Sequence, residues 1–520
     1  MKFEKILEEI NGFGSFQLLL IVLLCSPRIV LPCHYLLNIF IATVPPHHCD
    51  LSDLSDLDDA AETLTNLSDA QRLTVSVPKH KDGTFKSCEM FAERQFQLLS
   101  NISNISADVS TVQCHSGWVY DNSSFSSTLA TEWDLVCDRK SLRNTTGTIF
   151  FLGVMVGSIV FGFLCDKYGR KKTLLVSYVI SMVFSLSTIE WVDADHRSFI
   201  GVIGSLSWSV GNMMLAGFAF LVNDWRTLVM VVTAPLGLAV LTWWWIPESA
   251  RWLLANGKVE TAQFYLDRCA KFNKRAKVNV ETLCNKEDLE TQDKNYTYLH
   301  LIKTPKIRKI SVIIGIVWFG VAATYYGISL NIGGLGLNVY LTHFIYAAIE
   351  VPAKLMIYCL LDIIGRRKCQ SGTLLLTGTC IAINILVPRD LWIIRSVVAI
   401  LGKGLSEAAF TTVFLYTSEL YPTVVRQNAL GYANFVSRVG VSVAPLVLLL
   451  DDVWTPLPQI VLCCVAVSSG LASLLLPETL KARLPQTIDD IEEERGRNIV
   501  SSHAADSSAV FLEPKSEEDS

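Results

Sequence analysis

Among the basic residues that lie within long apolar runs, where a charge is costly, two stand out. Arg438 lies in the run 428–450, and Lys354 lies in the run 339–361. An ionisable side chain inside a membrane-spanning segment is rare and usually functional. The guanidinium of Arg438 can bind a carboxylate through two hydrogen bonds, whereas the ammonium of Lys354 acts as a point charge. The two residues therefore predict a site for small anions.

Nearby carboxylates offer both cations a structural role instead. Glu350 lies one helical turn before Lys354 and can neutralise it. Glu407 or Glu350 can equally pair with Arg438. Lys403 and Glu407 lie four residues apart on one helix face, and we expect these two to pair with each other rather than to bind a ligand.

No catalytic or cofactor-binding pattern accompanies these charges. We find no phosphate-binding Walker loop, no Cys/His spacing typical of a metal site and no nucleophile motif in a credible setting. The net charge of −5 comes from 44 basic and 49 acidic residues, and no basic tract is long enough to follow a nucleic-acid backbone. We expect no enzyme, no cofactor, no metal and no nucleic-acid partner. Without an ATP site, transport would be facilitated, exchanged or ion-coupled.

Apolar runs long enough to span a bilayer recur through the 520 residues, of which 51% are hydrophobic. A spanning helix needs about 20 apolar residues. The first run holds Pro27 and Pro32 and is long enough to be tilted or broken. The pattern predicts an all-α polytopic membrane protein with candidate spans at 15–44, 147–165, 173–189, 198–221, 227–246, 309–331, 339–361, 371–388, 391–417, 428–450 and 455–476.

One polar stretch, residues 45–146, combines cysteines with glycosylation sequons. Its four cysteines are Cys49, Cys88, Cys114 and Cys137, and its sequons begin at Asn66, Asn101, Asn104, Asn122 and Asn144. Together they indicate an oxidising, glycosylating compartment, so we expect an extracellular disulfide-bonded loop. Four cysteines allow three pairings, and the spacing does not choose among them.

Basic clusters set the expected orientation. Lysines and arginines gather at 167–172, at 366–368 and through the central loop, and such clusters favour the cytoplasm. The acidic, Ser-rich tail cannot build a core. The predicted segments are the N-terminus with the first helix (1–44), the extracellular loop (45–146), the rest of a first helical half (147–246), a cytoplasmic central loop (247–308), a second helical half (309–476) and a disordered cytoplasmic tail (477–520).

Three short motifs recur in the same order in the two halves. The first motif is Asp166, Gly169 and Arg170 in the first half and Asp362, Gly365 and Arg366 in the second. The second motif is Glu190 with Arg197 and its counterpart Glu419 with Arg426. The third is Pro247-Glu-Ser and its counterpart Pro477-Glu-Thr. The repeat predicts two parallel halves related by an axis along the membrane normal, with a path between them. We expect pairs among these charges to hold one conformation of an alternating-access cycle.

The repeat also shows that the first half is short. Asp362 and Glu419 lie 57 residues apart, but Asp166 and Glu190 lie only 24 apart, so about 33 residues are missing between them. If 173–189 spans the membrane, the basic central loop falls outside; if it is re-entrant, ten spans remain and the loop stays inside. The basic residues favour ten spans, and a glycan on Asn295, in the central loop, would contradict that topology.

Several motifs resemble the solute carrier 22 family of organic ion transporters over nearly the whole chain. They are Ile-Asn-Gly-Phe-Gly-Ser-Phe-Gln at 10–17, Pro-His-His-Cys at 46–49, Glu-Trp-Asp-Leu-Val-Cys-Asp at 132–138, Pro-Glu-Ser-Ala-Arg-Trp-Leu at 247–253 and Ser-Glu-Leu-Tyr-Pro-Thr-Val-Val-Arg at 418–426. In detail the chain is most similar to the organic anion branch, near members 13 and 14, the former a urate and nicotinate transporter. The resemblance implies a major facilitator fold of twelve helices, from which this chain departs with ten or eleven.

The resemblance also implies site residues. Arg438 and Lys354 match the cationic positions of the organic anion branch, and cation-transporting relatives have an acidic residue where Arg438 falls. Tyr325 and Tyr326 match paired aromatics that orient an aromatic anion, although ordinary packing explains them equally well. Asn38 resembles a substrate-facing asparagine.

The expected function is alternating-access transport of small organic anions, such as urate, nicotinate or other monocarboxylates, across the plasma membrane. A counter-anion is a candidate exchange partner. The alternative is a transport-deficient shortened variant, retained in the endoplasmic reticulum or acting as a regulatory partner.

Overall fold

The computed structural model describes most of the chain between residues 14 and 492. The described residues are 14–51, 67–80, 83–100, 109–168, 197–242, 247, 250, 253, 258–276, 298–331, 338–388, 390–422, 425–480, 485, 488, 491 and 492. The segment 173–189, the sequons at Asn66, Asn101, Asn104 and Asn295, and the acidic tail beyond 492 lie outside them.

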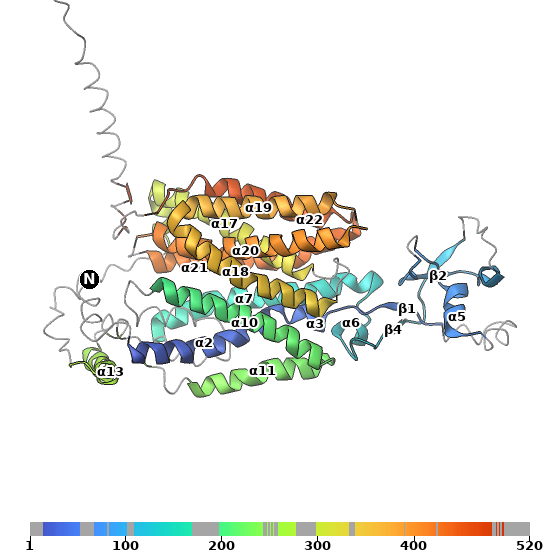
Figure 1. Ribbon diagram of the computed structural model, residues 1–520, viewed down its shortest axis with the longest axis horizontal. Coiled ribbons are helices and arrows are strands. Elements are labelled where there is room, and N and C mark those ends of the chain that lie inside the picture. The colour runs from blue at the N-terminus through green and yellow to red at the C-terminus, as the bar shows by residue number, and fades with distance from the viewer. Residues whose placement is uncertain are drawn as a thin grey trace, which may run out of the picture. The chain divides into compact units, whose positions relative to one another are not determined.

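Ten helices of 17 residues or more occur in the described residues (Figure 1). They are α2 (Ser15–Leu36), α7 (Lys140–Tyr168), α10 (Arg197–Leu221), α11 (Trp225–Thr242), α17 (Pro305–Leu330), α18 (Val339–Ile364), α19 (Arg366–Leu386), α20 (Trp392–Leu420), α21 (Arg426–Leu448) and α22 (Leu457–Ser473). Each corresponds to a predicted apolar run. The first run holds a break, because α2 ends at Leu36 and α3 (Asn38–Ile41) follows it.

The second half contributes six of these helices, α17 to α22, which lie side by side in Figure 1. Within the described residues, five segments are long and apolar enough to cross a membrane: Pro305–Leu330, Val339–Ile364, Arg366–Leu386, Trp392–Leu420 and Asn428–Asp451. α17 is their hub, since it packs against α20, α21 and α22. Trp318 of α17 is 1% exposed and donates its indole N–H to Thr417 Oγ1 of α20 at 2.9 Å.

α17 and α21 approach each other closely at a glycine. A Cβ atom at Gly440 would lie 2.6 Å from the carbonyl oxygen of Phe319, nearer than real side chains come. Only glycine allows this approach, as is usual where membrane helices touch backbone to backbone. The contact fixes α21, which carries Arg438, against α17.

The first half is shorter. α7 ends at Tyr168 and α10 begins at Arg197, so residues 169–196 are all that separates them. In the second half, α19 and α20 fill the corresponding interval between Asp362 and Glu419. Two spanning helices need about 40 residues, so the 28 residues of this interval are too few for both.

A short helix of the central loop packs on the start of α2. α13 (Val259–Phe272) ends beside Asn273, whose side chain accepts a hydrogen bond from Phe16 N at 2.9 Å and donates one to Gln17 Oε1 at 3.0 Å. Gln17 also donates to Cys269 Sγ at 3.4 Å, and burial raises the pKa of that thiol to about 11. The Phe-Gln pair in the N-terminal motif therefore anchors the central loop.

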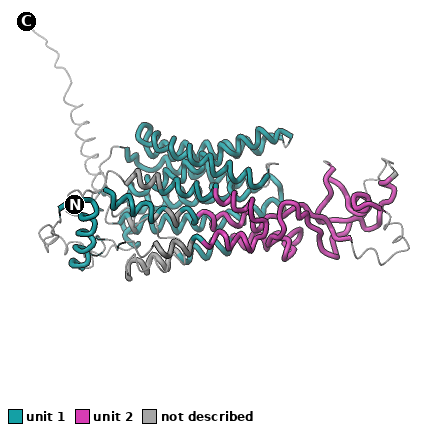
Figure 2. Tube along the Cα trace, turned by 60° about the horizontal axis from the view of Figure 1, so that its bottom comes forward, with its two compact units in different colours: residues 1–31, 148–213, 235–520 teal, residues 32–147, 214–234 magenta. Residues whose placement is uncertain are grey.

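The chain divides into two compact units, coloured separately in Figure 2. The second unit, residues 32–147 and 214–234, contains two small antiparallel sheets. β1 (His47–Cys49) pairs with β4 (Trp118–Tyr120), and β2 (Glu89–Phe91) pairs with β3 (Thr111–Gln113). In the same unit, Arg226 at the start of α11 forms an ion pair with Glu132, which holds the pKa of that carboxyl below its usual range.

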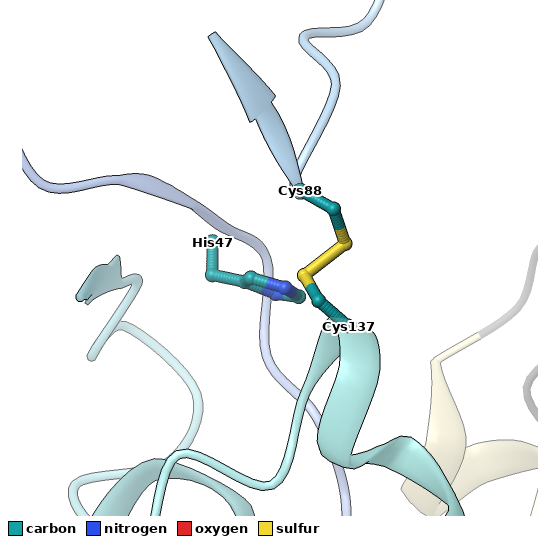
Figure 3. A group of neighbouring side chains, drawn as sticks. All are labelled: His47, Cys88 and Cys137. Atoms are coloured by element: carbon teal, nitrogen blue, oxygen red, sulfur yellow. A yellow bond between two sulfur atoms is a disulfide. The ribbon is translucent and has the colours of Figure 1, made fainter. Parts of the chain in front are cut away.

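Two disulfides close this unit. Cys49 bonds to Cys114 and Cys88 bonds to Cys137, which selects one of the three pairings that the sequence left open. His47 lies beside the second bond (Figure 3), and burial lowers the pKa of its imidazole. Cys88 and Cys137 are bonded to each other, so neither sulfur can act as a thiolate ligand. The group of His47, Cys88 and Cys137 is therefore not a metal site.

The two described sequons of the outer loop differ in accessibility. Asn122 is exposed in a turn, where Asp121 Oδ1 accepts a hydrogen bond from Ser123 N at 2.8 Å. Asn144 lies within α7 and is half-buried. Glycosylation therefore remains a prediction, with Asn122 the more accessible acceptor.

Candidate functional site

Four buried charges meet among the helices of the first unit. Lys354 and Glu350 lie one turn apart on α18, and Lys403 and Glu407 lie one turn apart on α20. Their exposed fractions are 1%, 0%, 2% and 5%, in that order. We call these residues the charge quartet. Two cations and two carboxylates give it no net charge.

Lys354 is fully coordinated. Its ammonium lies 3.0 Å from Glu407 Oε1 and 3.5 Å from Glu350 Oε2. It also donates to Ser209 Oγ at 2.6 Å and to the Ser205 carbonyl at 2.8 Å, both on α10. An ammonium group has three N–H donors, so all of them are used.

Glu350 is the centre of the quartet. One of its oxygens accepts hydrogen bonds from Tyr325 at 2.7 Å and forms an ion pair with Lys403 at 3.2 Å. The other accepts from Ser209 at 2.8 Å and faces Lys354. Buried charges are tolerated when they are paired and hydrogen-bonded in this way.

The side chain of Lys403 extends from α20 to α17. It donates to Ser329 Oγ at 2.7 Å, and its nitrogen lies 3.1 Å from the centroid of the Tyr325 ring. The expected pair between Lys403 and Glu407 is therefore wrong: the structure pairs Lys403 with Glu350 and Glu407 with Lys354. A lysine that precedes a glutamate by four residues is the weaker orientation on a helix, and the neighbouring helices offer better partners.

The two predicted tyrosines are both buried. Tyr325 and Tyr326 are each 2% exposed, with ring centroids 5.1 Å apart. Tyr325 also accepts a hydrogen bond from Trp208 Nε1 of α10 at 3.3 Å, and Tyr326 packs edge-to-face on Phe151 of α7 at 5.4 Å. In this conformation Tyr325 contacts the charge quartet through Glu350 and Lys403, and Tyr326 belongs to the apolar packing.

The other predicted binding residues lie elsewhere. Arg438 is half-buried on α21, and its carbonyl accepts a hydrogen bond from Ser442. Asn38 begins α3 in the second unit. The roles of both residues, and of Lys354 and the tyrosines, remain predictions.

A second cluster of charges joins the repeated motifs of the second half. Arg366, the first residue of α19, lies 3.0 Å from Glu419 of α20 and 3.3 Å from Asp362 of α18. Thr479 donates to Glu419 at 2.6 Å. Arg426, which the spacing associates with Glu419, donates to the carbonyl of Tyr421.

Glu478 of the Pro-Glu-Thr motif caps α19, and we call it the capping glutamate. It accepts hydrogen bonds from the backbone N–H groups of Arg366 at 2.8 Å and Arg367 at 3.2 Å. A carboxylate is favoured at a helix N-terminus, where these donors lack helical partners. Gly365 precedes the helix with φ of +98°, and a Cβ there would lie 2.7 Å from the capping carboxylate.

Most of the first-half counterparts of this cluster lie outside the described residues. Gly169, Arg170 and Glu190 lie outside the described residues. Asp166 lies in the last turns of α7, and Arg197 begins α10. The structure therefore displays the repeated charges in one half only.

Comparison with known proteins identifies the chain's relatives. A family profile described as Sugar (and other) transporter matches residues 96–190 and 184–487. Solute carrier family 22 member 7 of Sus scrofa is 41% identical over 95% of this chain and 97% of its own length. The chain belongs to the solute carrier 22 family. Member 7 of Homo sapiens is likewise 41% identical, and member 6-B of Xenopus laevis is 34% identical, each over 95% of this chain.

Solved structures confirm the fold of this solute carrier 22 protein. The proton:xylose symporter XylE, a major facilitator superfamily protein, matches with a TM-score of 0.58 over 92% of this chain and 99% of its own. At 15% identity this likeness shows the fold alone. The chain is thus a multi-pass membrane transporter of the major facilitator type, as predicted. The finer resemblance to members 13 and 14 remains a prediction.

Sequence reasoning missed the contribution of α10. Ser209 of the first half contacts Lys354 and Trp208 contacts Tyr325, but both belong to an apolar run in which a serine or tryptophan is unremarkable. The spacing of 205, 208 and 209 places all three on one helix face. This shared helix face was the signal available in the sequence. It could be interpreted only once the positions of the four quartet residues were known.

Proposed function

We propose that this transporter carries small organic anions by alternating access at the plasma membrane. Urate, nicotinate and other monocarboxylates are the candidate substrates, and a counter-anion is a candidate exchange partner. The proposal extends family membership, which establishes a transporter, to a substrate class and a cycle.

The observation that carries the proposal is the set of cations within the helices of the second half. Lys354 and Lys403 are buried, and Arg438 on α21 adds a third cation. A buried cation is tolerated when it is paired with an anion. In this conformation the two lysines meet Glu407 and Glu350, and a substrate anion would take the place of one of these carboxylates. The quartet also touches α10 of the first half, as expected for a site between halves that move relative to each other.

The test is uptake of radiolabelled urate and nicotinate by cells that express the chain, with surface biotinylation to count molecules at the plasma membrane. Arg438→Asp should abolish uptake at unchanged surface abundance, because it reverses the charge that meets the substrate carboxylate. Arg438→Lys keeps the charge but loses the bidentate geometry, so partial uptake is expected. Unchanged uptake by Arg438→Asp would refute the role.

The cytoplasmic cluster around Arg366 supports the alternating-access part of the proposal. Its charges join α18, α19 and α20 with the segment after α22, so separating them would loosen one end of the second half. Arg366→Ala should raise maleimide labelling of Cys369, which lies in the first turn of α19 and is 6% exposed. Equal labelling of wild type and variant would argue against a conformational lock.

A second candidate function rests on the shortened first half. The alignment with member 7 of Sus scrofa runs over 539 positions, and 95% of 520 residues is about 494, so about 45 positions hold no residue of this chain. Such a loss suits a transport-deficient variant that is retained in the endoplasmic reticulum or regulates a partner. Surface expression without uptake of any tested anion would favour this candidate.

A further inference from the structure

We infer that Glu407 is a proton-binding site and that each monovalent anion is carried together with one proton. The inference rests on the proposed function and names its coupling ion. It comes from the charge balance and the donor count of the quartet, which the transport proposal alone does not use.

Charge balance supplies the first step. The quartet holds two cations and two carboxylates in nearly complete burial, with no net charge. A monovalent anion that enters the quartet adds one negative charge that its four members do not compensate. An unpaired charge in a site of low dielectric is strongly unfavourable. One proton, the departure of another anion or a charge outside the quartet, such as Arg438 on α21, can restore neutrality, and the surroundings of Glu407 favour the proton.

The donor count shows what an entering anion displaces. All three N–H groups of Lys354 are engaged by Ser205, Ser209 and the two glutamates. An anion that binds this ammonium must take one of those places. The side chain of Ser209 is itself held by Glu350, to which it donates at 2.8 Å, so this acceptor is fixed.

Of the two carboxylates, Glu407 has fewer ion pairs and hydrogen bonds. Among the described residues, Glu407 forms an ion pair with Lys354 alone, at 3.0 Å, whereas Glu350 has two lysines, Tyr325 and Ser209. Glu407 is also the most exposed of the four, at 5%. When the anion takes its place on Lys354, Glu407 is left buried with no ion pair, and a proton removes that charge.

Charged and titratable groups from three neighbouring helices surround Glu407. Lys354 and Glu350 on α18, Lys403 on α20 and Tyr325 on α17 all interact electrostatically with it. His343 on α18 interacts electrostatically with Lys403 and Glu350. α21 packs against α20 and carries Arg438, a permanent cation.

The step balances in atoms and charge. One aqueous proton adds to a carboxylate oxygen of Glu407, the Lys354–Glu407 ion pair breaks, and one Lys354–substrate ion pair forms. The loaded quartet is neutral, as the empty quartet was, and release of the anion on the other side returns the proton to water. Transport of one monovalent anion with one proton is therefore electroneutral.

The experiment uses the purified full chain in proteoliposomes, with radiolabelled urate or nicotinate as the probe and protein-free vesicles to subtract diffusion of the neutral acids. Exchange of labelled against unlabelled probe is measured first, at equal pH on both sides. Net uptake is then measured with the exterior one pH unit more acidic. One-to-one coupling predicts accumulation that approaches about tenfold, because one pH unit corresponds to a tenfold ratio.

Variants separate the outcomes. Glu407→Gln is permanently neutral, so exchange should persist while accumulation driven by the pH gradient is lost. Glu407→Asp keeps the titrating group and should keep the gradient response, and Glu89→Gln in the second unit is the matched control, with a wild-type response expected.

If wild type exchanges neither probe, the proposed function fails. If it exchanges the probe but a pH gradient adds nothing beyond protein-free vesicles, or if Glu407→Gln keeps the gradient response, the proton site is refuted and exchange of anions restores neutrality instead. Should Glu407→Gln fail to fold, a pH-sensitive dye inside wild-type vesicles decides. Internal acidification on adding the probe, beyond that of protein-free vesicles, supports the inference, and no such excess overturns it.

Discussion

Removing the central carboxylate tests how the buried charges are paired. Glu350→Gln keeps the size of the side chain and a hydrogen-bonding oxygen, but it leaves two lysines with one carboxylate. Lys354 retains Glu407 at 3.0 Å, whereas the only carboxylate that the described residues place within 4 Å of Lys403 is Glu350. The variant should therefore isolate Lys403.

The expected loss follows from the distance. At 3.2 Å and an effective dielectric constant of about 20, the pair between Lys403 and Glu350 is worth about 5 kcal/mol. Removing one partner of a buried pair costs about 3–5 kcal/mol in measured cases. The Tyr325 ring lies 3.1 Å from the ammonium in the wild type and is kept in the variant, so it does not change the difference. We expect a net destabilisation of about 3–5 kcal/mol.

Rescue identifies the partner. Lys403→Met added to Glu350→Gln removes the isolated cation, so it should restore stability to within about 1 kcal/mol of wild type, since buried pairs are often replaceable by apolar groups. Lys354→Met added to Glu350→Gln should rescue less, because it leaves Lys403 and Glu407 only each other, in the weaker orientation on one helix.

The assay is thermal unfolding of the purified chain in detergent, followed by tryptophan fluorescence. Glu350→Gln should lower the midpoint by several degrees. Glu89→Gln is the matched control: its pair with Lys86 is about one-third exposed, and such pairs contribute less than about 1 kcal/mol. Equal rescue by Lys354→Met and Lys403→Met would refute the pairing.

The remaining predictions concern the ends of the helices and the outer loop. Gly365→Ala should destabilise the chain by about 1–3 kcal/mol in the same assay, because its φ is positive and its Cβ would meet the capping glutamate. Replacing the cysteines of the Cys88–Cys137 disulfide with serine should cost about 2–5 kcal/mol, and peptide mapping without reduction should recover that pair. Glycosidase-sensitive mass should disappear in part with Asn122→Gln and not at all with Asn295→Gln, since only the former is expected outside the cell.

Much of the fold was predictable because apolar length is a direct physical requirement of the bilayer. The ten long helices all fall on predicted runs, although α7 begins at Lys140, seven residues before its run, because polar residues extend a helix beyond the apolar core. The disulfide pairing was not predictable, since Cys49 and Cys88 reach their partners only through strand pairing that spacing does not reveal.

The buried charges were predictable as residues but not as partners. Lys354 stood out because an apolar run makes a lysine costly, and Glu350 was a foreseeable neighbour at one helical turn. The pairing of Lys354 with Glu407 and of Lys403 with Glu350 depends on how α18 and α20 face each other and on the position of the Tyr325 hydroxyl. Both are features of the tertiary structure. Local spacing favoured the wrong pair because it ranks only contacts within one helix.

The place of α10 bears on the choice between the two proposed functions. α10 begins immediately after the interval where the first half is short. Even so, Ser205 and Ser209 contact Lys354 of the second half, and Trp208 donates to the hydroxyl of Tyr325. Each residue turns a helix by about 100°, so a register change of one residue would carry both Ser209 Oγ and the Trp208 indole away from the quartet. The shortening has therefore left intact the helix face that joins the two halves. This favours a working transporter over a transport-deficient variant. The uptake assay with Arg438→Asp tests that preference.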